Sequence, residues 1–410
     1  MLEDLSSRKV APMLVTGPVP PAPLAPQEVG RTLAPFGFSR MLPRDAYLDD
    51  AVLAWERQNL FGGWVCLGRS ADVVPGGLSA ESLWNYALLL TRDEAGVLRG
   101  FENVCRHRSH ELLPCGGSAQ AKAIVCPYHA WSYQFDGSLL GAPGYGDVSD
   151  FDRAALALTQ VEVREWHGWV FVNRTGRAVP FEEHIGELEE TVAPYDADKM
   201  VTPVSHDYDV AANWKVIIEN FQECYHCSMI HPELSQVSPP DSGRNVEKDG
   251  NWVGGWLELR PGAQTMSLDG RSGGAVMPSL DEEQKHRVMY VALLPNLLLS
   301  LHPDYVMTHL LTPLSPERTR IQCSWAFPAV VAAADDFDPA YAVDFWDLTN
   351  RQDWAACESV QRGLRAPHYE PGPLAPAEDG VYQFVTTVAL NYRGSVAIRA
   401  PSEAGLAPLE

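Results

Sequence analysis

The stretch CRHRSHELLPCGGSAQAKAIVCPYHAWSY, residues 105–133, carries two pairs of potential metal ligands within one short segment. Cys105 and His107 are separated by one residue, Cys126 and His129 by two, and eighteen residues lie between the pairs. Thiolates and imidazoles are strong ligands for several transition metals. The segment therefore predicts a metal site, and the question is which metal it holds.

Short apolar or alternating runs surround this segment from about residue 62 to 175, and Gly and Asp punctuate them. Such runs are typical of a small antiparallel β domain, so we expect both ligand pairs on loops between strands. Two cysteines and two histidines bind structural zinc well. The same donors hold a Rieske 2Fe-2S cluster, in which two thiolates ligate one iron and two imidazoles the other. The spacing alone leaves both readings open.

A second group of potential ligands lies in NWKVIIENFQECYHCSMIHPE, residues 213–233. Glu223 and His226 are three residues apart and would share one face of a helix, whereas His231 would point roughly 140° away from His226. Both imidazoles can meet one ion only if the helix loosens or ends between them. Pro232 favours an end, because the residue before a proline disfavours the α conformation. Ordinary core or surface roles remain the alternative for two such histidines.

The composition is that of a globular protein of two or three domains, with 410 residues, 46% hydrophobic and 20% charged. A net charge of -22 argues against nucleic-acid binding and against an anionic membrane surface. The N-terminus lacks the basic and apolar pattern of a signal peptide. The longest apolar run, residues 288–301, is broken by Pro295 and predicts two buried strands joined by a turn. Eight cysteines without a regular framework favour a reducing cytoplasm over a disulfide scaffold.

The order of elements predicts an α+β protein. Residues 17–35 are rich in Pro and Ala and are expected to be extended, within an N-terminal arm of residues 1–44. A helix is expected over 45–61. After the β-rich region, the patterns predict helices at 187–195, 214–230 and 340–364, and strands at 252–260, 286–300, 305–312 and 319–327.

The two ligand segments together resemble one family. C-R-H-R followed by C-P-Y-H-x-W is similar to the Rieske motif of the Rieske non-haem iron oxygenases. The resemblance implies that Cys105, His107, Cys126 and His129 bind a 2Fe-2S cluster. It also implies a small antiparallel β Rieske domain over residues 45–180, with a leading helix, and a larger catalytic domain over 181–410 with an antiparallel sheet flanked by helices.

The second segment is similar to the mononuclear iron motif of that family, an acid followed by two residues, His, four residues and His. The resemblance implies that His226 and His231 bind a mononuclear Fe(II) together with a carboxylate from a later helix. Asp353, in Q-D-W-x-x-C-E, is our choice, and Asp347 and Glu358 are its rivals. Such a facial triad leaves positions open for oxygen.

The family's mechanism implies further partners. Its members form head-to-tail trimers in which an acid bridges a Rieske histidine to an iron-binding histidine of the next subunit, and Glu223 matches that acid. Because the sequence has no persuasive nucleotide or flavin signature, we expect electrons from a separate NAD(P)H-dependent reductase carrying flavin and a ferredoxin domain.

The substrate class follows from finer resemblances. Glutamate at position 223, with E-N-F-x-E-C-Y-H-C, L-H-P-D-Y-V and Q-R-G-L, looks most like glycine betaine, stachydrine and carnitine oxygenases. This implies oxidation of an N-methyl group with O2 and release of formaldehyde. A quaternary ammonium group binds to aromatic faces. The candidates in the second domain, several of which are expected to be core residues, are Trp252, Trp256, Tyr290, Tyr305, Trp325 and Trp346. Hydroxylation of an aromatic substrate is the alternative, and a non-enzymatic electron-transfer or zinc-binding protein is the alternative of another class.

Overall fold

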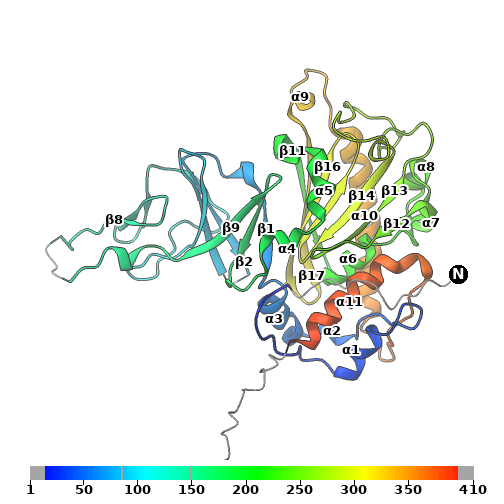
Figure 1. Cartoon of the computed structure of the whole chain (residues 1–410), viewed down its shortest axis with the longest axis horizontal. Coiled ribbons are helices and arrows are strands. Elements are labelled where there is room, and N and C mark those ends of the chain that lie inside the picture. Colours follow the sequence, from blue (N-terminus) through cyan, green and yellow to red (C-terminus); the bar gives the residue numbers. More distant parts are fainter. Residues whose placement is uncertain (1–13, 85, 147–149, 396–410) are drawn as a thin grey trace, which may run out of the picture.

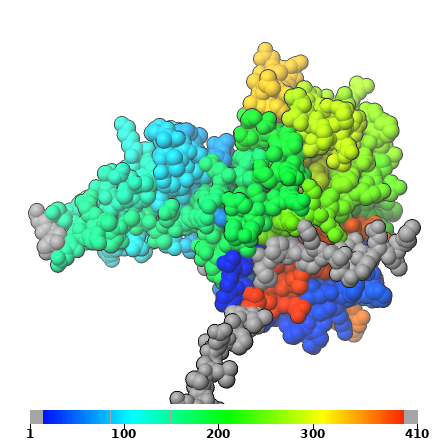
Figure 2. Space-filling model, in the orientation of Figure 1, coloured from blue at the N-terminus to red at the C-terminus, as the bar shows by residue number. Residues whose placement is uncertain are grey.

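The computed structural model describes residues 14–84, 86–146 and 150–395, arranged in two lobes (Figure 1). The strands form two seven-stranded sheets and one small three-stranded sheet. Figure 2 shows the first lobe projecting as a narrow mass from the broader second lobe. The paired strands in the described residues run antiparallel. Together with helices packed on the second sheet, this confirms the predicted α+β class.

The first lobe contains a sheet in the order β1-β10-β9-β4-β3-β2-β5 and the three-stranded sheet β6-β7-β8. Its strands are β1 (Trp64–Arg69), β2 (Gly77–Leu83), β3 (Tyr86–Arg92), β4 (Leu98–Glu102), β5 (Ser118–Gln120), β6 (Ile124–Val125), β7 (Ser132–Tyr133), β8 (Leu139–Gly141), β9 (Gln160–Trp166) and β10 (Trp169–Asn173). A compact core centred on Phe101, Trp131 and Tyr133 joins the two sheets. One cysteine of each predicted ligand pair, Cys105 and Cys126, belongs to this core.

The second lobe is built on the sheet β11-β17-β16-β15-β14-β13-β12. Its strands are β11 (Met200–Val210), β12 (Arg244–Val246), β13 (Trp252–Glu258), β14 (Arg287–Leu293), β15 (Leu297–Leu301), β16 (Val306–Ser315) and β17 (Arg318–Pro328). The apolar run at 288–301 forms β14 and β15, which pair across a turn at Pro295 and are largely buried, as predicted. The side chain of Asn296 in this turn exchanges hydrogen bonds with the backbone of Cys66 on β1, and so ties the two lobes together.

Eleven α-helices occur in the described residues, most of them in or against the second lobe (Figure 1). They are α1 (Pro26–Thr32), α2 (Asp45–Leu48), α3 (Asp50–Asn59), α4 (Phe181–Ile185), α5 (Leu188–Val192), α6 (Trp214–Phe221), α7 (Cys227–Ile230), α8 (Pro232–Val237), α9 (Ala329–Ala332), α10 (Ala340–Gly363) and α11 (Asp379–Arg393). The long helix α10 packs on α6, and α11 packs on α6 and β13. None of these helices combines the length and apolarity needed to cross a bilayer.

The N-terminal segment differs from its prediction. Residues 26–32, expected to be extended, form α1, which begins with Pro26 in the first turn and packs against α11. Proline is tolerated there because its missing N–H would have no partner in a first turn. The helix predicted at 45–61 is present as α2 and α3, separated at Asp49, whose side chain accepts a hydrogen bond from the N–H of Ala51. The domain boundaries at residues 44 and 180 remain predictions.

A buried ion pair anchors α6, the helix at the start of the second ligand segment. Lys215 Nζ lies 2.6 Å from Glu56 Oε1 of α3, and both side chains are fully buried. Glu56 also accepts hydrogen bonds from Trp214 Nε1, at 2.8 Å, and from the Tyr392 hydroxyl of α11. Residues far apart in the sequence therefore hold α6 in place.

Candidate metal centres and active-site cavity

The first ligand pairs lie on two loops with the same backbone turn. In the loop after β4, the N–H of Ser109 donates to the carbonyl of Cys105 at 3.0 Å; in the loop after β6, the N–H of Ala130 donates to the carbonyl of Cys126 at 3.1 Å. Ser109 and Ala130 both adopt a positive φ, 56° and 57°. Non-glycine residues rarely adopt this conformation. The two loops therefore present their cysteines in matching geometry.

The four predicted cluster ligands come together where the loops after β4 and β6 meet. Cys105 and Cys126 are buried free thiols, and the ring centroids of His107 and His129 lie 4.6 Å apart, with both rings partly exposed. His107 Nδ1 is buried without a hydrogen-bond partner. A buried polar atom left unpaired is costly. Two thiols and two imidazoles, one with such an atom, fit the donor set of a Rieske cluster.

Neighbouring aromatic residues support these loops. The ring of Trp131 stacks on His107 with centroids 4.8 Å apart, and the hydroxyl of Tyr133 lies 3.3 Å from Cys105 Sγ. Hydrogen bonds to cluster sulfurs tune the reduction potential. Cys115, in the same segment, is exposed and lies 3.2 Å from a carboxylate oxygen of Glu111.

The second ligand segment departs from the helix predicted at 214–230. Helix α6 ends at Phe221, and the carboxylate of Glu223 accepts the backbone N–H groups of Tyr225 and His226. A side chain that bonds to the local backbone competes with the helix, which explains the break. The helix end expected between the two histidines is confirmed: α7 ends at Ile230, His231 has φ -122° and ψ 68°, and Pro232 begins α8.

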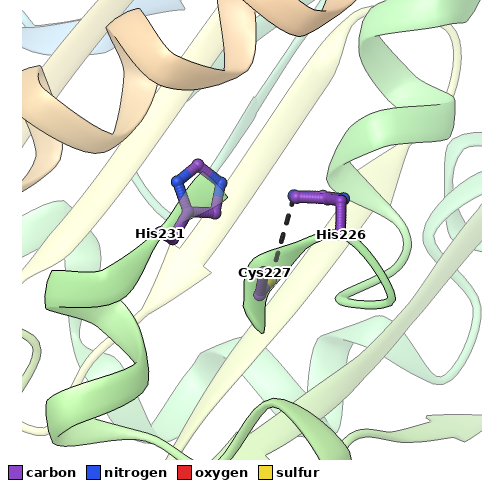
Figure 3. A group of neighbouring side chains, drawn as sticks. All are labelled: His226, Cys227 and His231. Atoms are coloured by element: carbon purple, nitrogen blue, oxygen red, sulfur yellow. Dashed lines mark hydrogen bonds between the residues drawn. The ribbon is translucent and has the colours of Figure 1, made fainter. Parts of the chain in front are cut away.

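His226 and His231 converge on one carboxylate. His231 Nε2 lies 2.9 Å and His226 Nε2 lies 3.4 Å from Oδ1 of Asp353 on α10. Figure 3 shows the two imidazoles facing a common space, with Cys227 beside His226. Two histidines and one carboxylate are the donor set of the facial triad that holds non-haem Fe(II). These residues fit a mononuclear iron site.

Both imidazoles are oriented through their other nitrogen. His226 Nδ1 lies 2.5 Å from Glu223 Oε1, and His231 Nδ1 lies 2.7 Å from Gln352 Oε1. Hydrogen bonds of this kind fix the tautomer of a metal-binding histidine and direct its free nitrogen to the metal. The sequence analysis gave Glu223 a role but missed Gln352, although Gln352 directly precedes Asp353 in the Q-D-W motif.

The two rival carboxylates have other partners. Asp347 accepts hydrogen bonds from the hydroxyl of Tyr208 at 2.6 Å and from Arg351 at 2.7 Å. Glu358 accepts the N–H of Ala211 at 3.1 Å. Of the three candidates, Asp353 alone contacts both histidines.

The contact between His226 and Asp353 shifts the pKa values of both side chains. Burial opposes the protonation of His226, but hydrogen bonds to Asp353 and Glu223 outweigh it and raise the pKa of His226 to about 10. Burial would raise the pKa of Asp353, yet the hydrogen bonds from His226 and His231 bring it below its usual value. Asp353 is therefore an ionised carboxylate facing both imidazoles, the form in which it could bind a metal.

A cavity of about 760 Å³ adjoins this site. Three of the six aromatic candidates, Trp256, Tyr290 and Trp346, line it. The other three, Trp252, Tyr305 and Trp325, are buried core residues, as expected for part of the set. Four further rings that sequence reasoning missed also line it: Phe221, Tyr225, His309 and Trp354.

Five of these rings form a continuous arc, in the order Trp346, Tyr290, Phe221, His309 and Trp354. Tyr290 contacts Trp346 and Phe221 with ring centroids 6.3 and 5.8 Å apart. His309 in turn contacts Phe221 and Trp354 at 6.1 and 5.9 Å. Burial, and then the negative charge of Asp353, raise the pKa of Tyr290, so its hydroxyl stays neutral. The cavity therefore has an aromatic wall beside a cluster of charged ligands.

The cysteines differ in part from expectation. The sequence favoured free thiols, and six cysteines are free, but Cys224 and Cys227 are joined in a disulfide that lines the cavity. The signal for this pair was present as a C-x-x-C spacing across His226.

Two family models match the chain. The model of the Rieske [2Fe-2S] domain matches residues 63–152, and that of the ring hydroxylating alpha subunit (catalytic domain) matches residues 198–394. The chain belongs to the Rieske non-haem iron oxygenases. Within this family, the first lobe corresponds to the Rieske [2Fe-2S] domain and the second lobe to the catalytic domain, which favours the enzyme over a structural zinc module.

This oxygenase has curated relatives along most of its length. It is 28% identical over 392 residues to the glycine betaine monooxygenase oxygenase subunit of Chromohalobacter salexigens, covering 88% of each chain. It is 31% identical over 238 residues to the carnitine monooxygenase oxygenase subunit of Escherichia coli, covering 56% of this chain and 62% of the relative.

Solved structures share the fold of this oxygenase. A quaternary ammonium Rieske monooxygenase in complex with L-carnitine matches with a TM-score of 0.73 and 23% identity, covering 90% of this chain and 99% of the other. Naphthalene 1,2-dioxygenase from a Rhodococcus species matches with a TM-score of 0.71 and 18% identity, covering 90% and 98%. At these identities the likeness establishes the fold alone.

Proposed function

We propose that this chain is the terminal oxygenase component of a monooxygenase that oxidises an N-methyl group of a small betaine-like quaternary ammonium compound. The single observation that carries the substrate class is the cavity beside His226, His231 and Asp353, whose wall is an arc of aromatic rings. A quaternary nitrogen cannot donate hydrogen bonds, so aromatic faces are its natural partners.

The charges around the cavity support a cationic substrate. Besides Glu223 and Asp353 of the iron site, its lining contains Asp241 and Asp379, whereas Arg244 is the one Lys or Arg among the lining residues. An excess of negative charge in a cavity raises the local concentration of cations. The related subunits named for glycine betaine and carnitine point to the same class.

The ligand roles are part of the proposal. Cys105, His107, Cys126 and His129 hold the 2Fe-2S cluster, and His226, His231 and Asp353 hold the mononuclear Fe(II). When bound, these groups supply electrons and activate dioxygen. The residues of this chain orient both imidazoles through Glu223 and Gln352, and the aromatic arc positions an N-methyl group and excludes water.

The overall reaction balances with two electrons from outside. One N-methyl group, O2, two electrons and two protons give an N-hydroxymethyl group and water, and the hydroxymethyl group then leaves as formaldehyde with one proton. A separate NAD(P)H-dependent reductase with flavin and a ferredoxin domain supplies the electrons. In a cytoplasmic homotrimer, Glu223 connects the mononuclear site to the cluster histidine of the next subunit.

The test is turnover by purified, iron-loaded protein with a surrogate reductase, comparing quaternary ammonium compounds with neutral aromatic compounds. We expect formaldehyde and a demethylated product from the first class. Hydroxylated aromatic products, without formaldehyde, would favour the ring-hydroxylating alternative instead.

An uncharged ligand of the same shape distinguishes recognition of the positive charge from burial of the methyl groups. In the tert-butyl isostere, carbon replaces the quaternary nitrogen while the shape is kept. Tyr290→Leu should weaken binding of the cation by about 1 kcal/mol more than binding of the isostere, since only the cation gains from the ring face. Equal losses for both ligands would argue against the aromatic arc as a cation site.

A further inference from the structure

Cys224 and Cys227 form a disulfide inside the second ligand segment. Their Cα atoms lie 4.9 Å apart, within the range of disulfide-bonded cysteines. The pair brackets Tyr225 and His226 and follows directly on Glu223. Both cysteines line the active-site cavity, so the bond lies where small molecules can reach it.

One of the two sulfurs lies among metal-binding atoms. Cys227 Sγ is 3.8 Å from His226 Nε2, and the ligand atoms of His226, Cys227 and His231 all lie within 4.8 Å of one another. Figure 3 shows Cys227 beside His226, opposite His231. A sulfur in a disulfide is not a thiolate, and the thiolate is the metal-binding form of cysteine. The bond therefore withholds a potential fourth ligand, beside His226, His231 and Asp353.

The pair is distinctive among the cysteines of the described residues. Cys105 and Cys126, the proposed cluster ligands, are free thiols, and the remaining cysteines, Cys66, Cys115, Cys323 and Cys357, are also free. Among the described cysteines, the disulfide is thus confined to the segment that carries His226 and His231.

We propose that Cys224 and Cys227 form a reversible dithiol–disulfide pair that controls the metal preference of the second site. In the disulfide form, His226, His231 and Asp353 are the donors, a set suited to Fe(II). In the dithiol form, Cys227 adds a soft sulfur donor, which favours zinc. The inference rests on the proposed ligand roles of His226 and His231.

The interconversion is thiol–disulfide exchange. The two protein thiols react with a low-molecular-weight disulfide such as oxidised glutathione, which is reduced to two thiols while the Cys224–Cys227 bond forms. A small dithiol reverses the reaction and becomes a disulfide itself. Two electrons and two protons move in each direction, so no further reactant is required.

The first test measures the bond directly. Protein with its cluster intact is equilibrated with oxidised glutathione or with reduced dithiothreitol, alkylated, and digested for mass spectrometry. We expect the peptide containing Cys224 and Cys227 to carry no alkyl group after oxidation and two after reduction. Cys115→Ser controls for glutathione attachment at the exposed cysteine. Two alkyl groups under both conditions would overturn the inference.

The second test measures the ligand. After removal of the mononuclear metal, zinc is added, and X-ray absorption at the zinc edge detects its neighbours without interference from cluster iron. The reduced protein should show a sulfur at about 2.3 Å. That sulfur should be absent from the oxidised protein and from Cys227→Ser, and present in Cys224→Ser.

The outcomes distinguish this inference from the proposed function. Zinc bound by the reduced protein without sulfur would overturn the inference and leave the roles of His226 and His231 standing. Zinc binding that His226→Ala does not change would overturn both.

Discussion

Gln352 Oε1 lies 2.7 Å from Nδ1 of His231, and the next residue of α10, Asp353, lies 2.9 Å from Nε2 of the same ring. Two consecutive side chains of one helix thus hold both nitrogens of one imidazole. Gln352 fixes the direction of the ring, and Asp353 shares the proposed iron with it.

Gln352→Leu should weaken iron binding, because the ring of His231 loses the hydrogen bond that orients it. Loss of such an outer hydrogen bond lowers metal affinity about 10- to 100-fold. Titration with an iron chelator, followed by iron analysis, measures this. Gln352→Glu keeps an acceptor oxygen and should restore most of the affinity; equal iron retention in wild type and Gln352→Leu would contradict the role.

Glu223→Gln should retain the cluster and the mononuclear iron but lose turnover, since the amide replaces the carboxylate that contacts His226 Nδ1. Iron content and the cluster spectrum report the metals, and product formation with a reductase reports turnover. Undiminished activity would remove Glu223 from the path of electrons.

Asp353→Ala should lose the mononuclear iron while the visible absorption of the cluster persists, because the two sites lie in different lobes. Asp347→Ala is the matched control on the same helix and should keep the iron. Iron retained by Asp353→Ala would require another third ligand.

Lys215→Met should destabilise the fold by about 3–5 kcal/mol, because it leaves Glu56 buried without its cation. Urea unfolding measures the change, and adding Glu56→Gln to the same chain should recover part of it. The exposed pair Arg318–Asp209 provides the comparison: Arg318→Met should cost no more than about 1 kcal/mol. Similar losses at both sites would show that burial does not govern the ion pair.

Glu219 should make stability depend on pH. Burial raises the pKa of Glu219 to about 8, although hydrogen bonding from Tyr47 and the charge of Lys215 oppose the rise. The folded protein therefore holds a proton that the unfolded chain releases at lower pH, so stability falls as pH rises from about 4.5 through 8.

Glu219→Gln should remove at least about 1 kcal/mol of that decline, since each unit of pKa shift corresponds to about 1.4 kcal/mol. Urea unfolding midpoints at a series of pH values measure the pH dependence of stability. The control is Glu190→Gln, which makes the same substitution at an exposed residue. An unchanged pH slope in Glu219→Gln would place the titrating group elsewhere.

The ligands were predicted because both segments resemble the motifs of one family; residue types and spacing alone left structural zinc, and ordinary roles for the histidines, open. Cys105, His107, Cys126, His129, His226, His231 and Asp353 were all predicted, and the structure brings each group together. Local patterns could not show how the chain ends a helix early. The break after Phe221 depends on the side chain of Glu223 bonding to backbone N–H groups, a contact that helical periodicity does not encode.

Contacts between residues far apart in the sequence were the second feature that could not be predicted. Whether an aromatic ring lines the cavity or fills the core depends on which sheet neighbours cover it, and so Trp346 and Trp325 could not be separated from sequence. Gln352 was visible in its motif, but its partner His231 lies more than a hundred residues away.

The matching turns of the two cysteine loops bear on how the cluster is assembled. Each turn is closed by a backbone hydrogen bond within the loop, at Ser109 and at Ala130. Each cysteine is thus held in a turn whose closing hydrogen bond lies within the protein itself. Less conformational entropy is then lost when the cluster arrives, and a preformed receptor of this kind binds more tightly than a flexible one.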